Sequence, residues 1–189
     1  MPESQQPAEG QRIMLAMILE DTDRAVIDVG AGTGKWGRLL VGKMRRIAGL
    51  EVWGPYVEKH RLADHYDELI ICDARRFTAW AEYQVVILGD VLEHMPRRDA
   101  TALVRALREA GPQVFLTVPV TPCIVDGSVY GNPYETHVDQ WTNGELVDQG
   151  WLRLHLGPNP NGLVQVGTYV LGREGRHGPV RDEQGAVAH

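Results

Sequence analysis

The sequence contains little cysteine and no long apolar run. Its two cysteines, Cys72 and Cys123, lie far apart, and neither belongs to a Cys-x-x-Cys pair. This pattern favours a reducing compartment and disfavours a zinc cluster. The longest apolar stretch, residues 13–20, is much shorter than the ~20 residues that a membrane span requires. We therefore predict no membrane-spanning segment.

Positive charge is also scarce. The chain has 19 Lys and Arg residues against 25 Asp and Glu residues, a net charge of −6, which disfavours a nucleic-acid partner. Residues 1–11 lack the basic and apolar regions of a secretory signal, so we expect a cytoplasmic protein. These residues and the tail 174–189 are polar and without periodicity. We predict that both are disordered and that one domain spans residues 12–173.

Within this domain, apolar runs typical of buried strands alternate with helical patterns. Strands are expected at residues 26–29, 47–53, 68–73, 83–90 and 113–118, with helices after the first, second and fourth of them. Continuous apolar strands separated by helices predict a parallel sheet that is covered on both faces. In the helix after the fourth strand, Asp99 is expected to cap the start and Gly111 to end it.

The last third of the chain departs from this alternation. Thr142 and Glu145 form a capping-box pattern, which predicts the start of a short helix. Residues 151–157 and 163–172 each alternate in polarity, and the turn sequence Pro-Asn-Pro-Asn-Gly separates them. Two strands joined by a tight turn are antiparallel. The sequence therefore predicts an α/β fold whose sheet closes with an antiparallel hairpin.

Three alternating glycines follow the first strand in the segment VIDVGAGTGKWGRLL, residues 26–40. Such a loop suits an ATP phosphate, a dinucleotide pyrophosphate or a ligand without a phosphate. A P-loop requires a glycine where Val29 stands and a hydroxyl where Trp36 stands, so ATP does not fit. The dinucleotide fingerprint requires a third glycine where Lys35 stands, which disfavours NAD without excluding it.

Acidic residues end the first three strands. Asp28 precedes the glycine loop and suits a cationic ligand group, while Gly30 and Gly32 let the backbone approach the ligand closely. Glu51 lies about 20 residues beyond Gly30, the spacing at which an acid binds ribose hydroxyls, and Asp73 follows the third strand. Each of these acids, taken alone, is best interpreted as a solvated or capping residue. Three at the carboxyl ends of successive parallel strands indicate a shared ligand site.

These segments together resemble class I S-adenosylmethionine (SAM)-dependent methyltransferases. IDVGAGTGKWG resembles motif I of that family, the segment around Glu51 its second-strand motif, and VVILGDVLEHM, residues 85–95, its motif IV with the "DVLEH" continuation. The resemblance covers residues 26–172. It implies a Rossmann-like seven-stranded sheet, mostly parallel, with a C-terminal antiparallel hairpin, and SAM as cofactor with S-adenosylhomocysteine as product. The cofactor-binding residues that it implies are Asp28, Gly30, Ala31, Gly32, Gly34, Glu51, Val52, Asp73, Ala74, Asp90 and Val91.

Methyl transfer requires an aligned acceptor and the removal of one proton. His94, directly after the fourth strand, and His137, in the long connection 120–141, are the candidate catalytic bases. A connection of this length predicts a substrate-covering loop. Two alternatives stay open: His94 only bonds a neighbouring loop, and Asp139 either orients a histidine or caps a turn.

A metal-binding interpretation rests on Asp90, Glu93 and His94, which have D-x-x-E-H spacing. This is similar to the E-x-x-E-H of some ubiquinone-pathway O-methyltransferases and of small-RNA 3′-end ribose methyltransferases, where His137 would add a ligand. The first side chain is one carbon shorter here, and "DVLEH" is common in metal-free relatives. A divalent metal is therefore not favoured, and no metal ligand is predicted.

The leading hypothesis is a methyltransferase that acts on a small-molecule acceptor. One alternative is metal-assisted ribose methylation of RNA, which would use Asp90, Glu93, His94 and His137. Another is a SAM-binding regulatory subunit without catalytic activity. The acceptor, the acceptor atom and the oligomeric state have no motif that identifies them.

Overall fold

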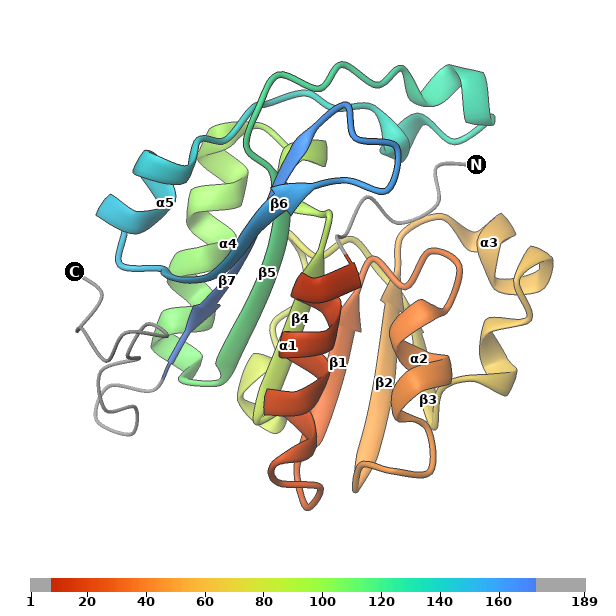
Figure 1. Cartoon of the computed structure of the whole chain (residues 1–189). Coiled ribbons are helices and arrows are strands. Elements are labelled where there is room, and N and C mark those ends of the chain that lie inside the picture. The colour runs from red at the N-terminus through yellow and green to blue at the C-terminus, as the bar shows by residue number, and fades with distance from the viewer. Residues whose placement is uncertain (1–7, 173–189) are drawn as a thin grey trace.

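The computed structural model describes residues 8–172 of the chain. A seven-stranded sheet runs through them in the order β3-β2-β1-β4-β5-β7-β6 (Figure 1). Strands β1 to β5 are parallel, and β7 pairs antiparallel with both β5 and β6. The predicted fold class is therefore confirmed. The strands are β1 Ala25–Val29, β2 Arg46–Glu51, β3 Glu68–Ile71, β4 Val85–Gly89, β5 Gln113–Pro119, β6 Leu152–Pro158 and β7 Gln165–Leu171.

Helices cover both faces of the sheet. One face packs against α1 and α2, and the other against α4 and α5 (Figure 1). The central strands bury side chains into both layers, as a parallel sheet between helices requires. No helix in residues 8–172 combines the length and the apolar character needed to cross a membrane. The helices are α1 Ala8–Leu19, α2 Lys35–Leu40, α3 Gly54–Lys59, α4 Arg97–Ala110 and α5 Asn143–Asp148.

The N-terminal boundary of the domain differs from the prediction. Helix α1 begins at Ala8 and buries Met14 and Ile18 completely, so residues 8–11 belong to the fold. The apolar residues of this helix do not form a clear stripe at helical spacing, so the sequence pattern does not predict the helix. The segment is considered in the sequence only as a membrane span that is too short. The rest of the two predicted disordered ends, residues 1–7 and 174–189, lies outside the described residues.

Two helix termini test the capping predictions. Helix α4 begins at Arg97 with Pro96 as its N-cap, so the prediction that Asp99 caps it is wrong. Because Asp99 lies within the first turn, its carboxylate is left to pair with Arg75 and Arg98. At the other end, Gly111 closes the helix in the left-handed conformation, as predicted. The capping box of α5, between Thr142 and Glu145, is also confirmed.

Candidate cofactor and acceptor site

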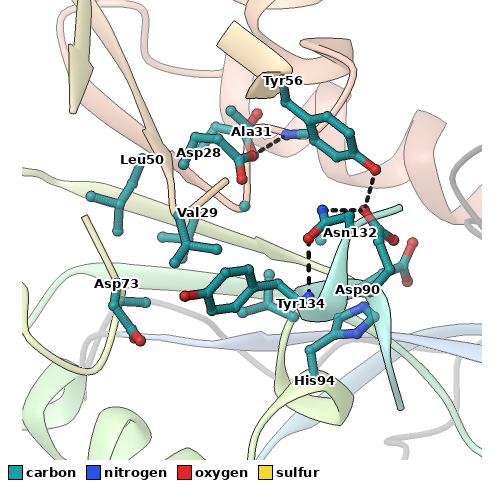
Figure 2. Close-up of a pocket in the computed structure, with 18 of the residues that line it drawn as sticks. Asp28, Val29, Ala31, Leu50, Tyr56, Asp73, Asp90, His94, Asn132 and Tyr134 are labelled. Carbon is teal, nitrogen blue, oxygen red and sulfur yellow. Dashed lines mark hydrogen bonds between the residues drawn. The ribbon is translucent and has the colours of Figure 1, made fainter. Parts of the chain in front are cut away.

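A cavity of about 210 Å³ opens at the carboxyl ends of β1, β2 and β4 (Figure 2). Among its lining residues are Asp28, Gly30, Ala31, Gly32, Glu51, Val52, Asp73, Ala74, Asp90 and Val91, with both candidate bases, His94 and His137. Gly34 is the predicted residue that does not line it. With φ at 78°, Gly34 is instead the N-cap of α2 and packs against Leu62 and His65. The structure thus brings twelve of the predicted site residues together around one cavity. Their role in binding stays a prediction.

The glycine loop holds its backbone close to the cavity. Gly30 and Gly32 have φ angles of 71° and 53°, which residues with a Cβ rarely adopt. A Cβ on Gly30 would also lie 3.1 Å from the side chain of Val91. The Gly30 amide donates to the Leu50 carbonyl at 2.8 Å, which ties the loop to the end of β2.

Glu51 braces this loop from the neighbouring strand. Its buried carboxylate accepts the amide of Gly32 at 2.8 Å and that of Trp53 at 2.7 Å. Burial raises the pKa of Glu51, and the two backbone hydrogen bonds oppose that rise. The carboxylate retains lone pairs beyond these two bonds, because each oxygen can accept two.

Asp28 lies at the end of β1 with almost no exposure. The hydroxyl of Tyr66 donates to its Oδ2 at 2.6 Å. Burial raises the pKa of Asp28 to about 7, against the lowering effect of the Tyr66 hydrogen bond. Lys35, which begins α2 and also lines the cavity, has its pKa lowered by burial while the charges of Asp90 and Asp28 oppose that change. A cationic ligand would therefore favour the ionised form of Asp28.

Asp73 pairs with the side chain of Arg75 in a bidentate arrangement. The Arg75 Nε lies 2.9 Å and 3.0 Å from the two carboxylate oxygens, and the Arg75 amide donates to Oδ1 at 2.9 Å. This pairing lowers the pKa of Asp73. Nothing in the local sequence signals whether the arginine two residues on folds back onto the acid or turns to solvent.

Asp90 adopts a left-handed backbone conformation, with φ at 56°, directly after β4. Its amide donates to the Thr117 carbonyl at 3.0 Å, and the Thr117 hydroxyl donates to Asp90 Oδ1 at 3.2 Å. This conformation is strained for a residue with a side chain, and the contacts with β5 hold it in place. Residues in such conformations cluster at functional sites, in agreement with the position of Asp90 on the cavity wall.

The two histidines come from different segments and meet edge to face, with ring centroids 4.9 Å apart. His94 Nδ1 donates to the Thr136 carbonyl at 3.2 Å, and His137 Nδ1 to the Cys123 carbonyl at 2.8 Å. Burial lowers the pKa of His94, while hydrogen bonds with the backbone of Thr136 and Asp90 oppose this decrease. Burial also lowers the pKa of His137, and the charge of His94 lowers it further. Both neutral rings therefore carry the proton on Nδ1 and a lone pair on Nε2.

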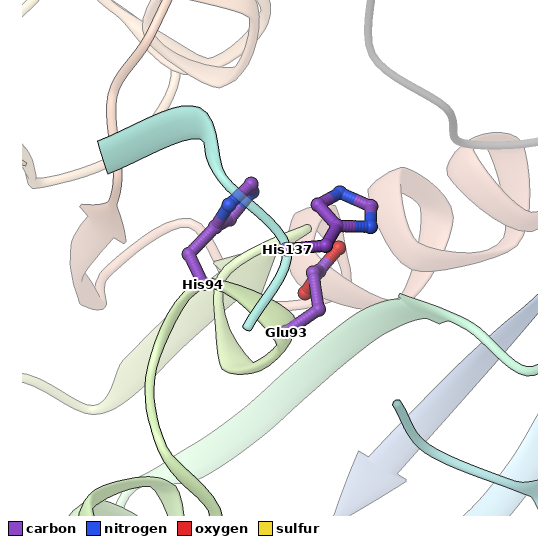
Figure 3. Close-up of side chains that lie close together, drawn as sticks. All are labelled: Glu93, His94 and His137. Carbon is purple, nitrogen blue, oxygen red and sulfur yellow. The ribbon is translucent and has the colours of Figure 1, made fainter. Parts of the chain in front are cut away.

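Glu93 lies beside the two histidines in the turn Leu92–His94 (Figure 3). One donor atom from each of the three side chains falls within 4.8 Å of the others. Glu93 is 2% exposed, and neither carboxylate oxygen has a hydrogen-bond partner in another described residue. Burial raises its pKa well above the ordinary value, and the charge of Asp90 adds to the rise. Asp90 itself is not one of the three converging residues.

Backbone hydrogen bonds fasten the long connection to this turn. The amides of Val138 and Asp139 both donate to the Glu93 carbonyl, at 2.9 Å and 3.2 Å. The Asp139 carboxylate pairs with Arg97, whose guanidinium lies 3.8 Å from the centre of the Trp141 ring. The Asp139 carboxylate also accepts the Gln140 amide at 2.7 Å, so of the two alternatives the structure favours the one in which Asp139 caps the turn before Trp141.

The connection also brings residues that the sequence analysis did not single out. Asn132, Tyr134 and Glu135 line the cavity opposite the glycine loop, and the Tyr56 hydroxyl donates to Glu135 Oε1 at 3.1 Å (Figure 2). The rings of Trp53 and Tyr134 lie 6.0 Å apart. These contacts join the connection to α3 and so give the cavity a second wall. The aromatic content of the loop was the available signal, but it did not identify which residues face inward.

No protein family model and no curated protein matches the sequence. Solved structures do match its fold. The 1,6-didemethyltoxoflavin-N1-methyltransferase of Burkholderia thailandensis, with its substrate and S-adenosylhomocysteine bound, superposes with a TM-score of 0.62 at 16% identity, over 87% of this chain and 77% of that one. The chain has the fold of class I SAM-dependent methyltransferases.

Two further structures have the same methyltransferase fold. The magnesium protoporphyrin IX methyltransferase of Synechocystis, with S-adenosylhomocysteine bound, gives a TM-score of 0.60 at 18% identity, over 86% of this chain and 83% of that one. The methyltransferase domain of bacterial CtHen1-CN gives 0.60 at 22% identity, over 87% of this chain and 100% of that one. At these identities the likeness establishes the methyltransferase fold.

Proposed function

We propose that this protein binds SAM in the cavity and transfers its methyl group to a small-molecule acceptor. The arrangement of Asp28, the glycine loop and Glu51 around one cavity of a methyltransferase fold carries this proposal. Asp28 would attract the ammonium group of the cofactor, the loop would pack against its amino-acid end, and Glu51 would accept the ribose hydroxyls. Asp73 and Ala74 would hold the adenine.

The main requirement of methyl transfer is that the protein aligns the acceptor with the methyl group of SAM. The acceptor attacks the methyl carbon of the sulfonium, the carbon–sulfur bond breaks with its electron pair on sulfur, and S-adenosylhomocysteine leaves as a neutral thioether. The acceptor loses one proton, and we assign its removal to His94 or His137, which both line the cavity and would accept the proton at Nε2. Alignment of the two reactants in the cavity would supply the larger part of the rate.

Structural relatives support a small acceptor. Two of the structural relatives are methyltransferases named for small molecules, 1,6-didemethyltoxoflavin and magnesium protoporphyrin IX. In this chain, the connection between β5 and α5 contributes Val125, Asn132, Tyr134, Glu135 and His137 to the cavity. We assign acceptor selection to this connection, because it forms the wall opposite the glycine loop.

A comparison of ligands tests the proposal. Thermal stability is measured with SAM, S-adenosylhomocysteine, NADH and ATP, each at the same concentration. We expect the first two to raise the melting temperature and the last two to leave it unchanged, since only a ligand that binds the folded state stabilises it. The variant Glu51→Gln should abolish the rise, and Glu68→Gln, on the exposed side of β3, should retain it. Stabilisation by NADH alone would overturn the assignment.

A further inference from the structure

We propose that Glu93, His94 and His137 bind a divalent transition-metal ion at the acceptor end of the cavity. The donor atoms of these three side chains lie within 4.8 Å of one another and come from two segments that fold together here (Figure 3). Four-coordinate ions with bonds of ~2.0 Å hold their ligand atoms about 3.3 Å apart. Side-chain movements of about 1 Å therefore close the site.

The state of Glu93 is the strongest argument for a cation. A buried carboxylate that is charged requires hydrogen-bond donors, and one that is protonated requires an acceptor for its own hydroxyl. No other described residue supplies either to Glu93, and its own backbone amide only partly opposes the rise in its pKa. Asp90 and Glu135 add negative charge nearby. A divalent ion satisfies both oxygens and neutralises this charge, which explains why an acid is placed there.

The histidines are arranged as metal ligands are. Each ring donates a hydrogen bond from Nδ1–H to a backbone carbonyl, which fixes the tautomer and leaves a lone pair on Nε2. Ligating histidines in proteins are commonly fixed by this kind of bond from the other ring nitrogen. The bonds from Val138 and Asp139 to the Glu93 carbonyl hold the two segments together, so the three donors are placed before an ion binds.

The donor set identifies the class of ion. Two imidazole nitrogens with one carboxylate suit Zn²⁺, Mn²⁺, Fe²⁺ or Co²⁺, whereas Mg²⁺ and Ca²⁺ prefer oxygen ligands. Three protein ligands leave at least one coordination position open, as in catalytic metal sites. We place the open position on the cavity side of the site, because His94 and His137 both line the cavity.

The open position has a consequence that rests on the proposed methyltransferase function. We assign to this position an acceptor that presents an oxygen, such as a phenol, an alcohol or a carboxylate. A coordinated hydroxyl ionises more readily than a free one, since the ion lowers the pKa of oxygen ligands. In this arrangement the two histidines would hold the ion, which would favour the ionised form of the acceptor oxygen, and the released proton would pass to solvent water rather than to a histidine base.

Cobalt titration of the untagged, full-length protein tests the site. The protein is first stripped with a chelator, which is then removed, and Co²⁺ binding is followed by its visible absorption and by the melting temperature. We expect one ion per chain, with absorption typical of nitrogen and oxygen ligands, and a higher melting temperature. Glu93→Gln and His137→Gln should each weaken Co²⁺ binding at least about tenfold. The matched control His155→Gln, on strand β6, should bind as the parent does.

Clear outcomes would overturn the site. If no stoichiometric Co²⁺ binding occurs, or if both Glu93→Gln and His137→Gln bind as the parent does, the proposal is wrong. Loss of binding in a variant counts when its melting temperature without metal is not lowered by more than a few degrees from the parent's. Catechol, a bidentate oxygen donor, probes the open position: in the Co²⁺-loaded protein with S-adenosylhomocysteine, it should shift the absorption. An unchanged spectrum at saturating catechol rejects the oxygen acceptor.

The same samples separate this proposal from the proposed function. Calorimetry with S-adenosylhomocysteine on the chelated protein measures the cofactor pocket without the metal. Cofactor binding without Co²⁺ binding rejects only the metal site. Stoichiometric Co²⁺ binding without cofactor binding rejects the methyltransferase proposal and leaves the metal site standing.

Discussion

The acidic side chains in the two halves of the cavity differ in their hydrogen-bond partners. On the β1–β2–β3 side, each acid already has protein donors: Asp28 has Tyr66, Glu51 has two backbone amides, and Asp73 has Arg75. On the side formed by the Leu92–His94 turn and the long connection, the Glu93 carboxylate has no donor from any other residue among residues 8–172. The first half is pre-organised by the protein alone, and the second half is complete only with a cation.

This contrast fits the two ligands that the proposals assign. A pocket for one invariant cofactor benefits from acids held in position before binding, because less conformational entropy is then lost. An acceptor site that relies on an ion keeps donors with unused lone pairs. Substitutions that affect the two halves differently therefore test the comparison directly.

The largest effect is expected from Glu51→Ala. This change leaves the Gly32 and Trp53 amides without their acceptor and removes the predicted ribose contact. Each buried unsatisfied amide costs about 1–3 kcal/mol, so we expect the free energy of unfolding to fall by about 2–4 kcal/mol. The affinity for S-adenosylhomocysteine, measured by calorimetry, should fall about 100-fold.

Glu68→Ala is the control for this change, because Glu68 is an exposed acid at the start of neighbouring β3. Its affinity should stay within about twofold of the parent's. If Glu51→Ala bound the cofactor as tightly as this control, the claim that the cofactor half is pre-organised by its acids would fail.

The substitution Glu93→Gln, on the other side of the cavity, is expected to change the free energy of unfolding in the opposite direction. The parent buries a carboxylate without partners, and the amide removes the ionisable group while keeping its shape. In the chelated protein we therefore expect the free energy of unfolding to rise by about 1–2 kcal/mol. Urea denaturation measures this, with Glu51→Gln as the comparison that should be destabilised. A loss of stability in both variants would remove the distinction between the two halves.

A smaller effect follows from the pKa of Asp28, which burial raises to about 7. Only the ionised form attracts a cationic cofactor group, so affinity should rise with pH and be about fivefold weaker at pH 6 than at pH 7. The apoprotein should show the reverse trend. A raised pKa means that the folded state retains a proton that the unfolded state has lost. This contribution to stability is therefore present below about pH 4 and is lost as pH rises through 7.

Calorimetric titrations between pH 5.5 and pH 7.5 measure the binding part of this profile. The Asp28→Asn variant supplies the control, since it lacks the titrating group and should give weak, nearly constant affinity. A parent profile as flat as that of Asp28→Asn would show that the ionisation of Asp28 does not control binding.

Much of this molecule follows from local sequence patterns. Apolar strand runs, the Thr142–Glu145 capping box and the turn before β7 predict the sheet and its antiparallel closure, and the structure confirms them. Acids at strand ends were sufficient to place Asp28, Glu51 and Asp73 on one cavity. These features depend on short-range periodicity and on the direction of parallel strands, which a sequence displays directly.

Long-range packing accounts for what the sequence did not predict. Tyr66 reaches Asp28 from 38 residues away, and no pattern near either residue indicates this pairing. His137 meets Glu93 and His94 because backbone bonds fasten the connection to the turn, a contact that spacing alone does not specify. For this reason the D-x-x-E-H spacing by itself disfavours a metal site, whereas the three-dimensional arrangement makes an ion the best explanation of Glu93.

The smallest effect is expected from Arg75→Ala, which removes the partner of Asp73. Arg75 is 40% exposed at its side chain, and exposed ion pairs contribute about 0–1 kcal/mol because water screens them. We expect the melting temperature to fall by less than about 2 °C and the affinity for S-adenosylhomocysteine to change by less than about threefold. Scanning calorimetry and binding calorimetry measure the two quantities. A loss as large as that of Glu51→Ala would mean that the Asp73 pair is as structurally important as the buried acids, and the cofactor half would then depend on its exposed rim as much as on its interior.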